Sequence, residues 1–339
     1  MISTSHRLLI GGYTKTGGRG IGVVDLEGDR LGLPSLIAEA ENPSYVITSP
    51  DGRHAYAVLE RTEGAVAAWS VGDGDAPWVA LGEQPTGGAD PCHLEISPDG
   101  RFLLSANYSS GSVGVHPIGD NGSLGERSDF VQHQGRVGPI PERQDGPHAH
   151  QVVFGPGGHL FVCDLGLDVV ITYDLDASGQ LSEVVRSEFA AGTGPRNLAF
   201  SSDGTTAWLV GELSSTLVTC AVDGARLVPG RPTSTRRAGA TADNTPAAIA
   251  RSQDGSRVLV GNRGDDTIAV FAVTDDGLQL DSVVASGGER PRFVGWGPDG
   301  STMLVGNQRS GSIVVANPHT GEVLSSAEWP SPTCLVVLP

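Results

Sequence analysis

The sequence predicts an all-β fold, a seven-bladed β-propeller whose ring is closed by N- and C-terminal strands that share one blade. Three observations predict it. A motif that ends in Pro-Asp-Gly and precedes an apolar run recurs at a spacing close to that of propeller blades. In each copy, β-branched and aromatic residues alternate with small or polar ones around a tight turn, which is the signal of a hairpin. No segment shows a sustained helical periodicity, so few helices are expected.

Six complete copies of the motif account for six blades. Each contains a first strand, a turn and a second strand, and successive turns are 45 to 58 residues apart. The copies begin at Pro43, Pro91, His148, Pro195, Pro246 and Pro291, and their turns lie at Asp51, Asp99, Gly157, Asp203, Asp254 and Asp299. A third strand follows in most copies, at residues 111–118, 168–175, 215–222, 267–273 and 312–318. A more variable fourth strand completes each blade.

The two chain ends supply the seventh blade. Residues 6–14 and 20–28 are similar to the second and third strands of a copy, and residues 332–338 to a first strand. Pairing these ends removes exposed sheet edges and closes the ring. We therefore expect a single domain over residues 1–339. The longest step between turns contains a loop at about residues 119–147, rich in Gly, Pro and charge, which is either a functional rim or a solvated surface excursion.

Composition excludes several classes of protein. Hydrophobic residues make up 38% of the chain, enough for a large core, and the net charge of −17 argues against a nucleic-acid partner, because such binding neutralises phosphates with Lys and Arg. No apolar run is long enough to cross a membrane, and the N-terminus lacks the pattern of a secretory signal, so we expect a cytoplasmic protein without a membrane partner. The four Cys are far apart and are interpreted as buried residues.

Aligned copies place equivalent residues at one level of the central channel expected in a propeller, and two positions stand out. One lies seven residues before the turn, after a position that is mostly Pro, and the other comes nine residues after the turn. Both vary in chemistry, whereas their neighbours are regular and apolar. The first position holds Ser44, Cys92, His150, Arg196, Ala247, Arg292 and Thr333. The second position holds Glu60, Tyr108, Glu212, Arg263 and Gln308, with Tyr13 from the N-terminal strand.

The charged members fall in contiguous copies and predict an active site. Three Arg near one Glu leave surplus positive charge, which suits a small anionic substrate held by guanidinium groups. A His can act as general acid or base, and a carboxylate can accept a proton or orient water, an effect of roughly 10²–10⁴-fold on rate. The predicted catalytic residues are His150, Arg196, Glu212 and Arg263, and the predicted substrate-binding residues are Arg292, Gln308, His148, Glu60 and Tyr108. Alternatively, Glu212 pairs with Arg196 or Arg263 only to neutralise a partly buried ring.

No metal and no cofactor is predicted. His148 and His150 would project from one face of a strand and could hold a metal ion, but the repeat marks no third ligand. His93, His133 and His159 are interpreted as surface or packing residues. The Gly-rich segment 17–22 is interpreted as a hairpin turn, because it lacks the strand-to-helix context of a phosphate-binding loop.

Several motifs resemble the seven-bladed propeller lactonase family, which contains a bacterial type of 6-phosphogluconolactonase and the fungal carboxy-cis,cis-muconate cyclases. The discriminating ones are Gly-Pro-Arg at 194–196, Glu-Leu-Ser-Ser-Thr at 212–216 and Asn-Arg-Gly at 262–264, and the resemblance covers essentially the whole chain. It implies that the family's catalytic histidine is His150, its active-site arginines Arg196 and Arg263, and its carboxylate Glu212. The chain departs from the family at Gly211 and Asn197, which leaves the choice of substrate open.

The leading hypothesis is a metal-independent lactone hydrolase, acting on a small anionic lactone such as 6-phosphogluconolactone. The same groups could close a lactone ring, as in a muconate-type cyclase, and either His150 or Glu212 could be the general base. A non-catalytic interaction platform is the alternative from another class. A monomer or a weak homo-oligomer is expected, because a closed propeller needs no partner for stability.

Overall fold

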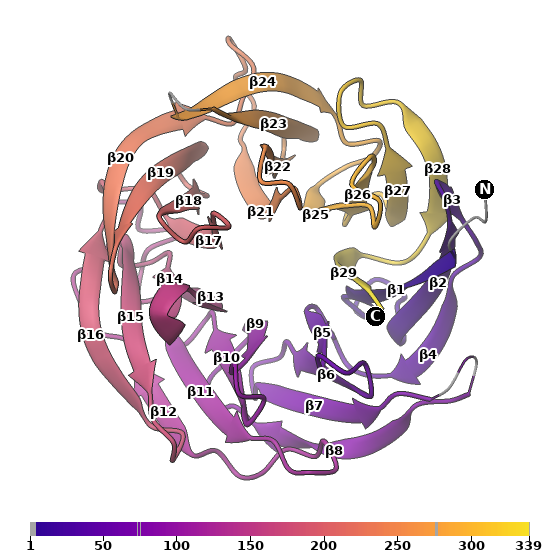
Figure 1. Ribbon diagram of the computed structural model, residues 1–339, viewed down its shortest axis with the longest axis vertical. Coiled ribbons are helices and arrows are strands. Elements are labelled where there is room, and N and C mark those ends of the chain that lie inside the picture. Colours follow the sequence, from indigo (N-terminus) through magenta and orange to yellow (C-terminus); the bar gives the residue numbers. More distant parts are fainter. Residues whose placement is uncertain (1–4, 73, 75, 275–276, 339) are drawn as a thin grey trace. The chain divides into compact units, whose positions relative to one another are not determined.

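The computed structural model describes residues 5–72, 74, 76–274 and 277–338, and within these residues the chain forms seven antiparallel sheets (Figure 1). The helical element among them is a single 3₁₀ turn, η1 (Pro156–Gly158). The predicted all-β, seven-bladed fold is therefore confirmed, as is the expectation of few helices.

One sheet contains both ends of the chain. Its order is β29-β1-β2-β3, and β4 also pairs with β2. In Figure 1, β29 lies beside β1 near the C-terminus. Its strands are β1 (Ser5–Gly12), β2 (Gly20–Glu27), β3 (Arg30–Leu31), β4 (Ser35–Glu39) and β29 (Pro332–Val337). The prediction that the terminal strands share one blade is thus confirmed.

The other six sheets have four strands each, in the order in which the chain supplies them. Three of them come from residues 46–188: β5 (Val46–Thr48), β6 (His54–Leu59), β7 (Ala65–Ser70) and β8 (Val79–Pro85); β9 (Pro91–Ile96), β10 (Phe102–Asn107), β11 (Ser112–Pro117) and β12 (Asp129–Gln132); β13 (Ala149–Phe154), β14 (Leu160–Asp164), β15 (Val169–Leu175) and β16 (Leu181–Glu188). Three come from residues 195–328: β17 (Pro195–Phe200), β18 (Thr206–Gly211), β19 (Thr216–Asp223) and β20 (Arg226–Ser234); β21 (Thr245–Arg251), β22 (Arg257–Arg263), β23 (Thr267–Thr274) and β24 (Gly277–Ala285); β25 (Pro291–Trp296), β26 (Met303–Asn307), β27 (Ser312–Ala316) and β28 (Val323–Glu328).

The chain divides into two compact units, each with its own core. The first contains the residues up to Glu39, Asn197–Cys220 and Gly230–Leu338, and the second contains Ala40–Arg196 and Ala221–Pro229. Within each unit, the core lies between the faces of neighbouring sheets, where side chains of the middle strands interdigitate. In the second unit, for example, Leu104 of β10 packs with Val152 of β13 and Ile171 of β15, all fully buried. The expectation of one domain over residues 1–339 stays a prediction.

A recurring turn holds the first two strands of most copies in register. In the first copy, Ser49 Oγ donates to Asp51 Oδ1 at 2.6 Å, and the Arg53 N–H donates to the same oxygen at 3.1 Å. Gly52 has a φ of +70°, which Gly adopts without strain. The same Ser-to-Asp hydrogen bond recurs at Ser97 and Asp99, Ser201 and Asp203, and Ser252 and Asp254. In these four copies, the turn fixes the end of the sheet that lies opposite to the predicted site residues.

The long loop predicted at about residues 119–147 is partly a strand and partly packed against the predicted site. Residues Asp129–Gln132 form β12, the fourth strand of its sheet. Beyond it, Gln144 is buried, donates through Nε2 to the Leu165 carbonyl at 2.9 Å, and accepts from the Ile140 N–H at 3.2 Å. The segment after β12, residues 133–147, is called the rim segment below; it is anchored by Gln144 but largely exposed, and a functional role for it stays a prediction.

Candidate functional site

The two positions singled out by the repeat lie at one end of each sheet. A first strand and the second strand that follows it are antiparallel, so the start of one meets the end of the other. Pro91 of β9 pairs with Asn107 of β10, and Pro291 of β25 pairs with Asn307 of β26. His150 and Arg292 follow the starts of such first strands, and Glu212 and Gln308 follow the ends of second strands.

The first of these positions is also a β-bulge. In β13, Ala149 pairs with Asp164 and Gln151 with Cys163, so His150 is the extra residue of the bulge. The same register shift falls at Cys92, Arg292 and Thr333. A bulge bends the strand and redirects the side chain of the extra residue, which is why bulges are frequent beside active sites. The side chain at this position is therefore exempt from the alternation of the strand and can be polar or charged.

In the second unit, Arg196 and His150 are in direct contact. The Arg196 Nη1 group donates a hydrogen bond to His150 Nε2, and both side chains are buried, with the residues about 5% exposed. A guanidinium only donates, so the His150 ring must offer its Nε2 lone pair and carry its proton on Nδ1. Tyr108 contacts the His150 ring edge-on, with ring centroids 5.7 Å apart. The sequence predicted these residues separately, and the structure brings them together.

His148 is held through both of its ring nitrogens. Nδ1 lies 3.0 Å from the Tyr108 carbonyl oxygen and Nε2 lies 2.9 Å from Asp145 Oδ1; a neutral ring donates to one of these acceptors, and an imidazolium donates to both. The ring also stacks on that of Tyr108, with centroids 4.7 Å apart. The hydrogen bond from His148 lowers the pKa of the Asp145 carboxyl. With both nitrogens committed to acceptors, His148 holds the rim segment against Tyr108 rather than presenting a lone pair to a substrate or a metal.

A buried His–Asp pair, which the sequence analysis did not select, supports this end of β13. Asp164 Oδ1 accepts from the His148 N–H at 2.9 Å and from the Leu167 N–H at 3.0 Å. Its Oδ2 accepts from His133 Nδ1 at 2.7 Å, and both side chains are completely buried. His133 was expected to be a surface or packing residue. Its partner ends a second strand one position before the aligned site position, so the spacing of the repeat alone did not select it.

His93 is a buried, neutral histidine whose pKa is affected by the charge of Arg196. Burial, and to a lesser extent the charge of Arg196, lower the pKa of His93 to about 3. Its ring stacks on Tyr45 with centroids 4.1 Å apart. The interpretation of His93 as a packing residue is confirmed, and its neutral ring adds no charge next to Arg196.

In the first unit, Glu212 and Arg263 form a buried ion pair. Arg263 Nη2 lies 2.7 Å from Glu212 Oε2, and the two side chains are 6% and 2% exposed. Arg263 Nε donates to the Thr245 carbonyl at 2.9 Å, which fixes the plane of the guanidinium. The pairing with Arg263 foreseen as a structural alternative is therefore present. A buried pair of this kind is costly to break, so its structural and chemical roles must be separated by experiment.

The remaining predicted residues are less buried. The Arg292 guanidinium lies over the Tyr13 ring at 5.3 Å from its centroid, an attractive arrangement of a cation and an aromatic face. Gln308 is half-buried at the end of β26. Glu60 accepts a hydrogen bond from Ser44, its counterpart at the first position of the same sheet. The prediction that these nine residues belong to one active site stays a prediction.

Among the described residues, no group of three or more His, Cys, Asp or Glu side chains is arranged to hold a metal ion. Likewise, no helix in the described part of the chain is long and apolar enough to cross a membrane.

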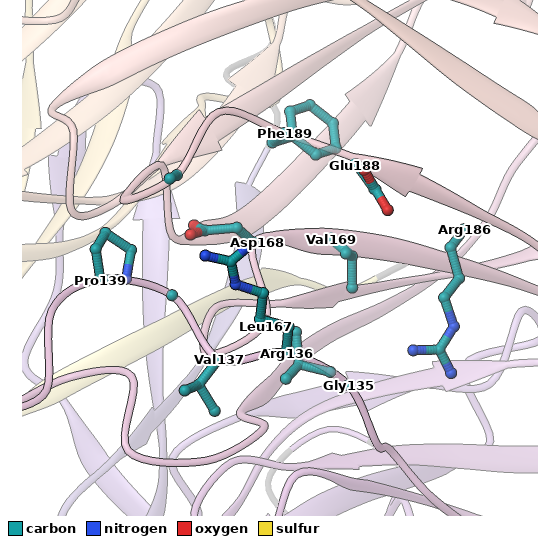
Figure 2. Close-up of a pocket in the computed structure, with 12 residues that line it drawn as sticks. Gly135, Arg136, Val137, Pro139, Leu167, Asp168, Val169, Arg186, Glu188 and Phe189 are labelled. Carbon is teal, nitrogen blue, oxygen red and sulfur yellow. The ribbon is translucent and has the colours of Figure 1, made fainter.

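A cavity of about 500 Å³ lies between residues 135–139 of the rim segment and strands β15 and β16 (Figure 2). Two of the four charged side chains that line it bind other groups of the chain. Asp168 accepts from the N–H groups of Gly192 and Gly194 at 2.7 Å each, and Arg186 is bound by Glu183 through two hydrogen bonds of 2.8 Å. None of the predicted site residues lines this cavity.

Comparison with known proteins gives the class of this fold. Residues 7–337 match the family described as "Lactonase, 7-bladed beta-propeller". The 6-phosphogluconolactonase of Bacillus subtilis (strain 168) is 32% identical over 347 residues, covering 97% of each chain. Among solved structures, the periplasmic gluconolactonase of Pseudomonas aeruginosa has a TM-score of 0.92 at 32% identity, covering 99% of both chains. A protein from Lactobacillus plantarum matches with a TM-score of 0.92 at 35% identity, covering 99% of this chain and 100% of its own.

These findings define the protein as a seven-bladed β-propeller of the lactone-hydrolysing class. The chain belongs to the seven-bladed β-propeller lactonase family. The family resemblance inferred from the Gly-Pro-Arg, Glu-Leu-Ser-Ser-Thr and Asn-Arg-Gly motifs is confirmed.

Proposed function

We propose that the protein hydrolyses 6-phosphogluconolactone, and that the His150–Arg196 and Glu212–Arg263 pairs both serve this reaction. The B. subtilis relative named 6-phosphogluconolactonase supports the substrate, because it aligns along almost the whole chain. The observation that carries the proposal is the placement of a buried guanidinium group, that of Arg196, at a repeat position that needs no charge for packing. The corresponding residues in other copies are Ser44, Cys92 and Ala247. Arg263 places a second buried guanidinium at the other repeat position.

Arg196 is suited to the carbonyl of the lactone. In lactone hydrolysis, water adds to the carbonyl carbon, negative charge develops on the carbonyl oxygen, and the ring C–O bond then breaks. A guanidinium donor that is already oriented stabilises this charge without reorganisation, and one such donor is worth about 10²–10³-fold in rate. The hydrogen bond to His150 and the position on β17 orient Arg196 in this way.

Glu212 is the general base in this proposal. An ionised carboxylate has roughly four acceptor positions, so a hydrogen bond from Arg263 to Oε2 is compatible with binding a water molecule. Glu212 takes a proton from the attacking water, and the proton returns to the ring oxygen as the C–O bond breaks. His150 acts as a positioning residue for Arg196, because its Nε2 lone pair accepts from the guanidinium.

The experiment is hydrolysis of 6-phosphogluconolactone generated in situ from glucose 6-phosphate, with the spontaneous rate subtracted. Wild type is compared with Glu212→Gln and Arg196→Ala, each checked for folding by circular dichroism. Arg257→Gln is the matched control, because Arg257 lies on β22 with Arg263 but at its other end, in a surface pair with Asp281 at 2.9 Å.

We expect rapid turnover by wild type and by Arg257→Gln, and a loss of at least 10²-fold in kcat for the two site variants. A wild-type rate equal to the spontaneous rate contradicts the substrate, and carboxymuconates and unphosphorylated lactones are then the next compounds to assay. Unchanged turnover by a folded Glu212→Gln variant contradicts the role of Glu212.

A further inference from the structure

A second arginine pair, outside the predicted site, lines a cavity of about 400 Å³ in the first unit. The cavity lies at the end of the β25–β28 sheet that carries Gln308. Its lining includes Thr16, Arg290, Gln308, Arg309, Ser310 and Ser331. Gln308 is one of the predicted substrate-binding residues, so the cavity adjoins the position already singled out in this sheet.

Arg290 occupies a backbone conformation that its residue type disfavours. It precedes the initial Pro of its copy and has a φ of +55°. Four equivalent residues also have a positive φ, between +47° and +61°, and they are Asn42, Asp90, Gly194 and Ser331. Gly adopts this region freely, and Asn and Asp tolerate it through local hydrogen bonds, whereas a long side chain there is strained. Strain of this kind persists where the surrounding structure imposes the conformation, and it clusters at functional sites.

The backbone of Arg290 is fixed on both sides. Its N–H donates to Asp266 Oδ1 at 2.7 Å, and its carbonyl accepts from the Gln308 N–H at 3.0 Å. Asp168 holds the equivalent N–H of Gly194 in the same way at 2.7 Å, so the arrangement belongs to the scaffold. The scaffold thus imposes the backbone conformation at this position, but it does not require an Arg there, because other copies carry Asn, Asp, Gly or Ser.

The charge of the pair is not balanced by the chain. Within the described residues, neither Arg290 nor Arg309 forms an ion pair. Arg61 is the residue equivalent to Arg309 in the first copy, and there Glu83 and Glu41 bind the guanidinium at 2.7 and 3.3 Å. On a protein with a net charge of −17, two guanidinium groups without acidic partners in one cavity concentrate positive charge for an anion.

We propose that Arg290 and Arg309 form a subsite for the phosphate group of the substrate. Guanidinium groups bind phosphate oxygens through paired, charge-assisted hydrogen bonds, and Ser310 and Thr16 add hydroxyl groups to the lining. This inference rests on the proposed lactonase function. It goes beyond that function because it assigns the choice of a phosphorylated over an unphosphorylated lactone to residues outside the catalytic pairs.

The test measures kcat/KM for 6-phosphogluconolactone and for glucono-δ-lactone in parallel. The variants are Arg290→Asn and Arg309→Ser, which introduce the residues found at the equivalent positions 42 and 109. Arg61→Ser is the matched control, since it removes an equivalent guanidinium that acidic side chains already neutralise. Titration calorimetry with inorganic phosphate measures the subsite without any reaction.

We expect each subsite variant to lose about tenfold or more in kcat/KM for the phosphorylated lactone, with little change for glucono-δ-lactone. Phosphate binding should weaken in parallel, and Arg61→Ser should behave as wild type. The Tm of Arg290→Asn should equal or exceed that of wild type because the strain is relieved, which separates a binding role from a structural one.

Three further outcomes separate the subsite from the lactonase proposal. Wild type that hydrolyses both lactones equally, with unchanged preference in the variants, overturns the subsite and leaves the lactonase function intact. Wild type that hydrolyses neither lactone, yet binds inorganic phosphate in a manner lost in Arg290→Asn, supports the anion site and contradicts the proposed reaction. Phosphate binding that is unchanged in both variants overturns the subsite whatever the activity.

Discussion

A double-mutant cycle can separate the structural role of the Glu212–Arg263 ion pair from its role in the proposed reaction. Glu212→Gln leaves a guanidinium without its carboxylate, and Arg263→Met leaves a carboxylate without its guanidinium, in surroundings where the side chains are only 2% and 6% exposed. Removing one partner of a buried pair costs about 3–5 kcal/mol in the free energy of unfolding. Replacing both partners leaves no unpaired charge, and we expect the double variant to lose about 2 kcal/mol or less.

The stability assay is urea unfolding followed by circular dichroism, with the free energy taken from the linear dependence on urea. Lactone hydrolysis is measured on the same preparations. The double variant should regain most of the stability of wild type and none of its activity, because the proposed base is absent. Additive losses of stability would refute the coupling of the pair. Recovery of turnover in the double variant would refute Glu212 as the base.

Three other predictions concern the sheet β9–β12 and its neighbour. Burial raises the pKa of Glu95 to about 7, so the free energy of unfolding falls as the pH rises from 4.5 to 7 and the buried carboxyl ionises. By urea unfolding, Glu95→Gln should therefore be more stable than wild type by about 1–3 kcal/mol at pH 8 and differ little from it at pH 4.5. Burial lowers the pKa values of His93 and His116 to about 3 and 4, so below pH 6.5 the free energy of unfolding should fall by up to about 1.4 kcal/mol per pH unit for each residue. His93→Phe should reduce this slope, and an unchanged slope in that variant would contradict the prediction. Asp164→Asn should lower kcat about tenfold with little change in KM, because Asp164 holds the start of β13, where His150 lies; a change in KM alone would contradict this role.

The stabilisation predicted for Glu95→Gln is smaller than the full pKa shift would give, because the Glu95 side chain is partly exposed to water. The residue is half-buried in β9, so water screens part of the charge, and the full difference between pKa values of 4.5 and about 7 overstates the free energy. Equal stability of wild type and Glu95→Gln at pH 4.5 serves as the internal control.

The repeat made most of the fold predictable. Strand positions followed from the spacing of the turns, and the joining of β29 to β1 followed from the incomplete copies at the chain ends. The same alignment found both members of the His150–Arg196 and Glu212–Arg263 contacts. It could do so because equivalent residues of a repeat occupy equivalent places in their sheets, so a charged residue where other copies carry Ser or Ala is visible without a structure.

What the alignment could not reveal came from contacts outside the repeat. Asp145 binds His148 and Arg143 Nη2 donates to the Tyr108 hydroxyl at 3.3 Å, but both lie in a segment that no other copy contains. Asp164 ends β14 and becomes significant only because the His148 N–H meets its carboxylate. The ionisation of such groups depends on burial and partners, neither of which has a sequence signature in a single copy.

The β-bulge explains why one repeat position can vary in chemistry while its neighbours do not. In a regular strand, the residue after the initial Pro would alternate into one of the two packed faces and would need to be apolar. As the extra residue of a bulge, it leaves that alternation, and the next residue resumes the pairing, as Gln151 does with Cys163 and Phe293 with Gly306. His150 and Arg292 thereby enter the scaffold without disturbing the core, and the same device frees the position for Cys92 and Thr333 where no charge is required.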